Sequence, residues 1–194
     1  MPSEILSTVR PTPLRLWGFL VTVAGALVAG IGATRDWAVL GFASDEHGAL
    51  DVPVKGTDVW EGKVVLAAAI LALVLTLALR LLPPTDARRA LALTVVTLGA
   101  LAMALAISVA IRADARFANT GGLDQIAANL ARQRGLPPEE ARTQLQEQYG
   151  SDLRIDPAAG LWLTSVGGTF IVVGGSLSLA WVRRVSLGAE ASEA

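Results

Sequence analysis

Four long apolar stretches, which together contain only Arg80 as a charged residue, constrain this chain more than any other feature of its sequence. Each is about as long as a helix needs to cross roughly 30 Å of hydrocarbon. A surface helix of a soluble protein would have a polar face, and none of these stretches has one. The sequence therefore predicts an all-α membrane protein, a bundle of four transmembrane helices. The predicted spans comprise residues 16–33, 64–82, 90–111 and 158–182.

The composition narrows the possible functions. Hydrophobic residues make up 53% of the 194 residues and charged residues 17%, which is more apolar than a soluble domain of this length requires. The net charge is −1 and the basic residues are spread among short loops, so we expect no nucleic-acid partner. Cysteine is absent, and the single histidine, His47, lies in a loop. Thiolate metal sites and a histidine-held haem inside the bilayer are therefore excluded.

The first apolar stretch also has features of a signal peptide. Arg10 and Arg15 precede it, and the small residues of 30–33 end it. We expect this segment to be retained as the first span.

Lysine and arginine beside the spans predict the orientation, because they concentrate on the cytoplasmic side. Seven arginines fall on one side of the predicted spans, and the first loop of the other side has more acidic than basic residues. We expect a plasma-membrane protein with both ends in the cytoplasm, a cytoplasmic loop at 83–89 and outer loops at 34–63 and 112–157. The seven are Arg10, Arg15, Arg80, Arg88, Arg89, Arg183 and Arg184.

Tryptophans mark the predicted edges of the membrane. Indole rings collect where hydrocarbon meets water, and all five tryptophans lie near the ends of the spans. Trp17 and Trp181 are expected at the cytoplasmic edge, and Trp37, Trp60 and Trp162 at the outer edge. The alternative, that they are ordinary core aromatics, leaves this placement unexplained.

The first outer loop has the pattern of a β-hairpin. Residues 37–43 and 49–55 are rich in strand-forming or alternating residues, and residues 44–48 between them have turn chemistry. Pro53 cannot donate a ladder hydrogen bond, so it confines its strand to an edge.

The second outer loop is too long to be a featureless connection, and it predicts a helical hairpin. Apolar residues share one helical face in 121–134 and again in 137–149. Gly135 and Gly150 follow these segments, where helix-ending glycines belong. Such short helices are marginal alone, so their apolar faces must rest on the bundle, the membrane surface or a partner protein.

Small residues recur along the first and fourth spans. Such stripes let helix backbones approach closely in lipid, either within the bundle or against another membrane subunit or a lipid. Packing within the bundle is the simpler interpretation. Docking of another membrane subunit or a lipid is the more specific one. The candidate positions are Gly18, Thr22, Ala26 and Gly30 in the first span, and Gly160, Thr164, Gly168 and Gly175 in the fourth.

Residues that could carry chemistry are scarce. Transporters and intramembrane enzymes place ionisable groups inside the bilayer, and the spans hold none apart from Arg80, which can snorkel to the surface. No catalytic, metal-binding or cofactor-binding residue is predicted. Asp45, Glu46 and Asp51 match no calcium loop, and no Gly-x-Ser-x-Gly turn or phosphate loop is present. Charged residues at the outer ends of the spans are expected to form solvated ion pairs, namely Arg35, Asp36, Glu61, Lys63, Arg112, Asp114 and Arg116.

Two motifs carry a resemblance to a known family. The first span ends in glycines followed by Trp37, and Gly-Thr-Asp-Val-Trp-Glu-Gly-Lys at 56–63 opens the second. This layout resembles uncharacterised actinobacterial four-span membrane proteins, including the tryptophan-associated membrane proteins. The resemblance covers the spans and the first loop and implies an architecture without an activity. Four spans with an outer strand pair also resemble claudin-type proteins, whose paired loop cysteines are absent here.

Three functional hypotheses follow. The leading one is a non-enzymatic accessory or scaffold subunit of a membrane protein complex, which binds partner subunits through its small-residue faces and outer part. The second is a carrier or sensor of lipid or another apolar molecule, with a cavity between the first and fourth spans. The third is a transporter or channel subunit that forms a pore as an oligomer, with hydroxyl groups along a wet path at Thr94, Thr97, Ser108, Thr164 and Ser165.

Overall fold

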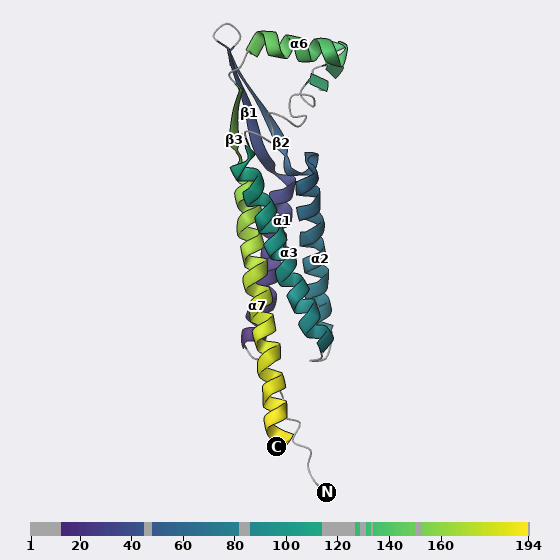
Figure 1. Ribbon diagram of the computed structural model, residues 1–194, viewed down its shortest axis with the longest axis vertical. Helices are drawn as coiled ribbons and strands as arrows, with labels where there is room; N and C mark the ends of the chain where they lie inside the picture. The colour runs from purple at the N-terminus through teal and green to yellow at the C-terminus, as the bar shows by residue number, and fades with distance from the viewer. Residues whose placement is uncertain are drawn as a thin grey trace.

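The computed structural model describes residues 13–44, 48–81, 86–113, 127–128, 131–132, 134–149 and 153–193. It is a long molecule in which four helices lie side by side and a small sheet extends from one end of them (Figure 1). The first helix begins, and the last helix ends, at the end opposite the sheet. The elements are α1 Pro13–Thr34, β1 Asp36–Ser44, β2 Gly48–Lys55, η1 Gly56–Asp58, α2 Trp60–Leu81, α3 Asp86–Ile111, α6 Pro138–Tyr149, β3 Leu153–Pro157 and α7 Ala159–Glu193.

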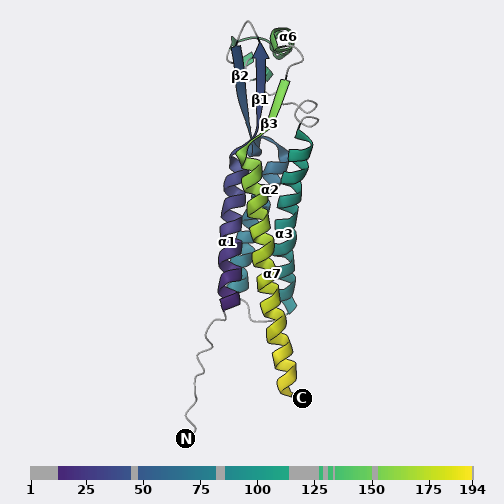
Figure 2. The same cartoon turned by 90° about the vertical axis from the view of Figure 1, so that its left-hand side faces the viewer.

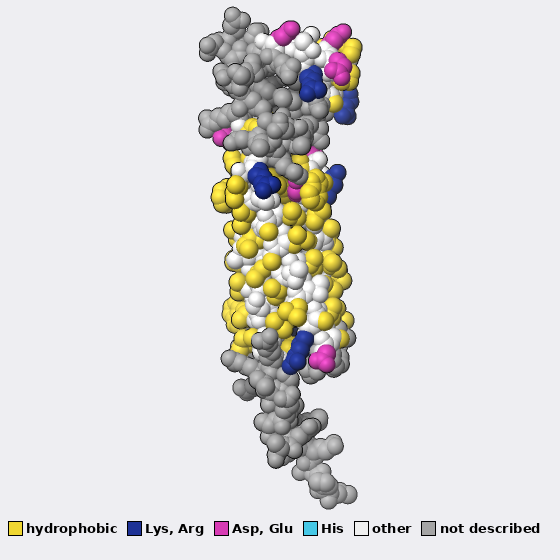
Figure 3. All heavy atoms as spheres, viewed as in Figure 1, with side chains coloured by type: hydrophobic (Ala, Val, Ile, Leu, Met, Phe, Trp, Pro, Cys, Tyr) yellow, Lys and Arg dark blue, Asp and Glu magenta, His cyan; other side chains and the backbone are white. Residues whose placement is uncertain are grey.

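The prediction of four membrane-spanning helices is confirmed. The stretches Leu14–Thr34, Trp60–Leu81, Asp86–Ile111 and Ala159–Val182 are helices long and apolar enough to cross a membrane. On the face of the bundle that Figure 3 shows, hydrophobic side chains form a wide band, and charged side chains of the described residues lie above and below it. α7 continues to Glu193, past the predicted end of its span, and projects beyond the other helices (Figure 2).

The helices pack with small residues inside and large residues outside. Most of the buried hydrophobic residues in the spans are alanines, such as Ala29, Ala72 and Ala102, all 0% exposed. Large side chains such as Leu27 and Val74, both 54% exposed, cover the outside. In lipid, apolar side chains gain nothing by leaving the solvent, so helices associate by close backbone packing between small residues. This distribution suits a bundle whose solvent is hydrocarbon.

One end of the bundle carries a three-stranded antiparallel sheet in the order β2-β1-β3. The predicted hairpin is present, with Val39 of β1 paired to Pro53 of β2, and Pro53 lies on an edge strand as expected. β3, which pairs Asp156 with Val39, was not predicted. Leu153, Arg154, Ile155 and Asp156 alternate apolar with polar residues, but this is the shortest run that indicates a strand. The all-α fold class is corrected by this three-stranded sheet.

The segment between α3 and α7 contains the second of its two predicted helices, as α6. Residues 121–126, 129–130 and 133 of the first lie outside the described residues. Gly135 ends that segment with φ +67°, and the Leu136 amide donates to the Ala131 carbonyl at 3.0 Å. This is a Schellman cap, which favours glycine because the left-handed conformation costs other residues energy. Ala131 and Ala141 are buried in the same apolar cluster as Leu40 of β1, so this region rests on the sheet.

Candidate functional site

Small residues of α1 and α7 face each other inside the bundle, at positions that coincide only in part with the predicted stripes. A Cβ atom added to Gly25 would lie 2.8 Å from the Gly167 carbonyl oxygen, and one added to Gly167 would lie 2.7 Å from that of Gly25. The same reciprocal closeness joins Gly32 to Gly160 and Gly18 to Gly174. Because glycine recurs every seventh residue on both antiparallel helices, the backbones lie close together from the Gly18–Gly174 contact to the Gly32–Gly160 contact. We call these six glycines the glycine seam.

The second face of α7 packs on α3 in the same way. A Cβ atom on Gly99 would lie 2.9 Å from the Gly168 carbonyl oxygen, and one on Gly168 would lie 2.9 Å from that of Gly99. A Cβ atom added to Gly175 would lie 2.8 Å from Cγ2 of the Val96 side chain on α3. Among the glycines of the predicted stripes, Gly30 has open space, since an added Cβ atom would have its nearest neighbour 3.9 Å away, at Leu66 Cδ1.

The predicted docking faces are therefore largely occupied within the chain. Gly18, Thr22, Gly160, Thr164, Gly168 and Gly175 meet α1, α3 or α7, and Ala26 is buried in an apolar cluster. The seam packs α1 and α7 backbone to backbone between Gly18 and Gly32, in the region where the lipid-carrier hypothesis placed a cavity. The sequence also carries a seven-residue glycine period, and this period, unlike the four-residue one of the predicted stripes, matches the contacts between α1 and α7.

The hydroxyl groups of the spans do not converge on one path. Thr164 is 0% exposed, and its Oγ1 has no hydrogen-bond partner. Thr94, Thr97 and Ser108 lie on the exposed face of α3, and each donates to a carbonyl of its own helix. Such bonds satisfy a hydroxyl group that faces lipid.

The tryptophans fall into two groups. Trp17, Trp60 and Trp162 are 61%, 58% and 63% exposed, as a position at the membrane interface requires. Trp37 differs, because its side chain is 0% exposed. The expectation that Trp37 faces the interface is therefore wrong: it is a core residue at the junction of the bundle and the sheet. Trp181 is half-buried against arginines at the other end of the bundle.

Three glycines, Gly32, Gly56 and Gly160, pack against the Trp37 side chain. Its Nε1 donates to the Gly32 carbonyl at 3.0 Å. A Cβ atom on Gly56 would lie 2.5 Å from Nε1, and one on Gly160 would lie 2.9 Å from Cδ1. The Ala158 amide also donates to the Trp37 carbonyl, at 2.9 Å. These contacts join the sheet to α1, to η1 just before α2, and to α7. They give a physical reason for the glycines around Trp37 and at the start of the 56–63 motif.

The expected ring of solvated outer charges is only partly present among the described residues. Arg35, Lys63 and Arg112 are exposed. Glu61, however, is 4% exposed, so its carboxyl group is not a solvated member of that ring. Asp114, Arg116, His47, and the Asp45 and Glu46 of the calcium hypothesis lie outside the described residues.

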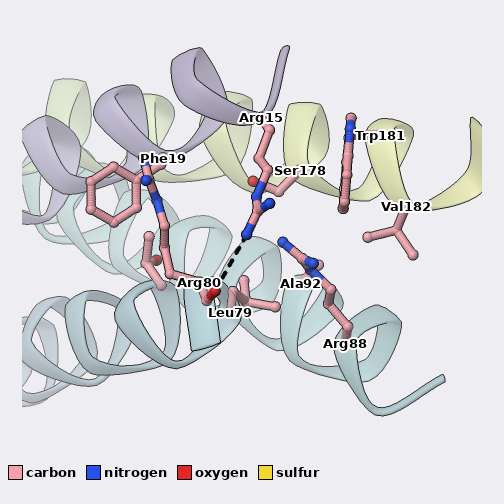
Figure 4. Close-up of a pocket in the computed structure, with 10 residues that line it drawn as sticks. Arg15, Phe19, Leu79, Arg80, Arg88, Ala92, Ser178, Trp181 and Val182 are labelled. Carbon is pink, nitrogen blue, oxygen red and sulfur yellow. Dashed lines mark hydrogen bonds between the residues drawn. The ribbon is translucent and has the colours of Figure 1, made fainter. Parts of the chain in front are cut away.

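At the end of the bundle opposite the sheet, three arginines come together around a small pocket (Figure 4). They approach from three different helices, Arg15 from α1, Arg80 from α2 and Arg88 from α3. The Arg15 and Arg88 guanidinium carbons lie 5.3 and 4.5 Å from the centre of the Trp181 ring. We call this site the arginine pocket; its lining is Arg15, Phe19, Thr76, Leu79, Arg80, Arg88, Ala92, Ser178, Trp181 and Val182.

Each arginine of the pocket is held by a specific contact. Arg15 Nη2 donates to the Arg80 carbonyl at 3.3 Å, which caps a carbonyl left open at the end of α2. The Arg80 guanidinium stacks on Phe19 at 4.1 Å. Arg88 is only 6% exposed, and its guanidinium stacks on Trp181. From the sequence, these arginines are expected only as markers of orientation, and no local pattern predicts that they meet.

The chain matches no protein-family model and no curated protein. The resemblance to tryptophan-associated membrane proteins therefore rests on the motifs around Trp37 and Trp60 alone.

Proposed function

We propose that this protein is a non-enzymatic accessory or scaffold subunit of a larger membrane protein complex, which presents its outer sheet and α6 to a partner subunit. The observation that carries the proposal is the junction at Trp37. β1 follows α1 directly and β3 leads directly into α7, so the two helices joined by the glycine seam also hold the sheet. A rigid connection of this kind suits a protein that holds a surface at a fixed height above the membrane.

The outer surface that would be presented is polar. Glu139, Glu140, Arg142 and Thr143 are exposed on α6, while Ala141 on its other face is buried against the sheet cluster. Charged and polar groups on a partner surface provide specificity and association rate. The small-residue faces contribute to the proposal only through the rigidity of the bundle, because they are occupied within the chain.

Site-specific photocrosslinking in native membranes tests this proposal. A photoreactive amino acid at Thr143 would contact the partner, whereas the same group at Leu71, 45% exposed within a span, would face lipid. We expect one discrete heavier adduct from Thr143, which weakens when Glu139 and Glu140 are changed to lysine. Leu71 provides the matched control and should give no discrete adduct.

Two results would count against the proposal. A discrete adduct from Leu71 with none from Thr143 would assign docking to the helices. Recovery of the chain from native membranes in mild detergent only as a lone monomer, with no adduct at either position, would remove the scaffold function.

A further inference from the structure

We infer that the arginine pocket binds a phosphate anion, and that its occupant is the headgroup of an anionic phospholipid. The first observation is its charge. Arg15, Arg80 and Arg88 line the pocket, and no aspartate or glutamate is among its described lining residues. Like charges at the edge of a low-dielectric region repel one another, and an anion between them relieves that repulsion.

The second observation is an unused donor. Arg15 Nε is buried and has no hydrogen-bond partner, although Nη2 of the same guanidinium is bonded. A buried N–H group without a partner costs free energy. The oxygens of a phosphate match the planar fork of a guanidinium, which makes arginine the preferred residue for binding it.

The third observation is the fixed orientation of the donors. Trp181 stacks with both Arg15 and Arg88, whose guanidinium groups extend toward each other from α1 and α3 (Figure 4). Because the indole contact already restricts both side chains, an anion would lose less free energy in ordering them.

The position of the pocket favours a lipid over a soluble phosphate. Four of the lining residues lie close to an end of their candidate spans. Arg15 and Arg88 lie where α1 and α3 begin, and Arg80 and Trp181 lie where the second and fourth spans end. Arginine and tryptophan at span ends lie at headgroup depth. Most of the other lining residues are apolar, as contact with an acyl chain requires. In the orientation proposed from the basic residues, this end faces the cytoplasmic leaflet, where anionic lipids provide a negative surface.

The size of the pocket fixes how the headgroup would bind. Its enclosed volume is about 20 Å³, enough for roughly one water molecule. A phosphate group would therefore lie at the mouth, beside the exposed Arg80, and would reach the buried Arg15 Nε through the one water molecule for which the pocket has room. This site is independent of the outer surface in the scaffold proposal, so either can fail without the other.

Lipid binding to the full-length, delipidated chain in detergent provides the test. Native mass spectrometry would compare phosphatidylglycerol with phosphatidylcholine of the same acyl chains, and a separate arm would add inorganic phosphate. We expect phosphatidylglycerol to bind at least about tenfold more tightly than phosphatidylcholine, and Arg15→Gln or Arg88→Gln to remove about tenfold of that affinity. Arg15→Lys, which keeps the charge but lacks Nε, should also weaken binding. Arg80→Gln changes an exposed residue and is the variant least able to disturb folding.

Arg89→Gln and Arg112→Gln are the matched controls. Arg89 lies on the same helix as Arg88 but pairs with Asp86 at 3.7 Å, and Arg112 lies at the opposite end of α3. Both should bind phosphatidylglycerol as the unmodified chain does. Equal affinity for the two lipids, or an equal loss in the controls, would overturn the inference. If millimolar inorganic phosphate displaced phosphatidylglycerol as effectively as added lipid does, the pocket would still be an anion site, but its assignment to a lipid headgroup would be overturned.

Discussion

Gly25 of α1 and Gly167 of α7 face each other so closely that a Cβ atom on either one would lie within 2.8 Å of the carbonyl oxygen of the other. This is the middle contact of the glycine seam. The neighbouring atoms are backbone, which cannot move aside as the end of a flexible side chain can. Since α1 and α7 also carry β1 and β3, the same contact sets the position of the sheet on the bundle.

Alanine at either residue should therefore separate the two helices. We expect Gly25→Ala and Gly167→Ala each to destabilise the chain by about 1–3 kcal/mol, the usual cost of overpacking a filled core. Gly30→Ala is the matched control on α1, because the added Cβ atom would have its nearest neighbour 3.9 Å away. Thermal unfolding in detergent measures the difference, and an equal loss in all three variants would show that the seam has no special role.

Trp37 should contribute to stability far more than the other outer tryptophans. It is 0% exposed and donates a hydrogen bond to the Gly32 carbonyl. Trp37→Ala should cost about 3–5 kcal/mol, as expected for removing a large buried aromatic side chain. Trp162→Ala, at a residue 63% exposed, should change the unfolding temperature little. Equal effects of the two substitutions would mean that Trp37 does not join the sheet to the bundle.

Gly135 offers a test of backbone conformation without a packing change. Its φ is +67° and a Cβ atom would meet nothing within 4 Å, so only the left-handed conformation opposes a side chain. Gly135→Ala should destabilise the Schellman cap by about 1 kcal/mol, and Gly135→Asn by less, because asparagine tolerates this conformation. Hydrogen exchange at the Leu136 amide reports the cap directly. Slower or unchanged exchange in the alanine variant would contradict the cap.

The spans could be predicted from sequence because hydrocarbon imposes length and apolarity on each helix alone. β3 could not be predicted in this way, since Leu153–Pro157 is a strand only through its pairing with β1, whose nearest residue in sequence is more than a hundred positions away. Trp37 could not be recognised as a core residue for a related reason. Its position at a span end is typical of an interface tryptophan, and only the glycines brought to it from elsewhere, such as Gly56 and Gly160, make it a core residue.

The arginine pocket was hidden in the same way. Arg15, Arg80 and Arg88 each have a sufficient local explanation at the end of a span, so nothing in the sequence required them to meet. The antiparallel packing of the helices brings their ends together, and Trp181 of α7 then gives Arg15 and Arg88 a common surface. Convergence of span ends is a tertiary property, and single-helix patterns do not contain it.

The orientation of the chain can be measured with few changes because the sequence has no cysteine. Thr143 on α6 and Asp86 at the start of α3 are both exposed and lie toward opposite ends of the molecule. Arg15, Arg80 and Arg88 lie at the span ends on the Asp86 side, and basic residues beside span ends are retained on the cytoplasmic side. In intact cells, a membrane-impermeant maleimide should therefore label Thr143→Cys and leave Asp86→Cys unlabelled. Permeabilised cells supply the control, since both cysteines should then react, and the reverse labelling in intact cells would show that the sheet and α6 face the cytoplasm.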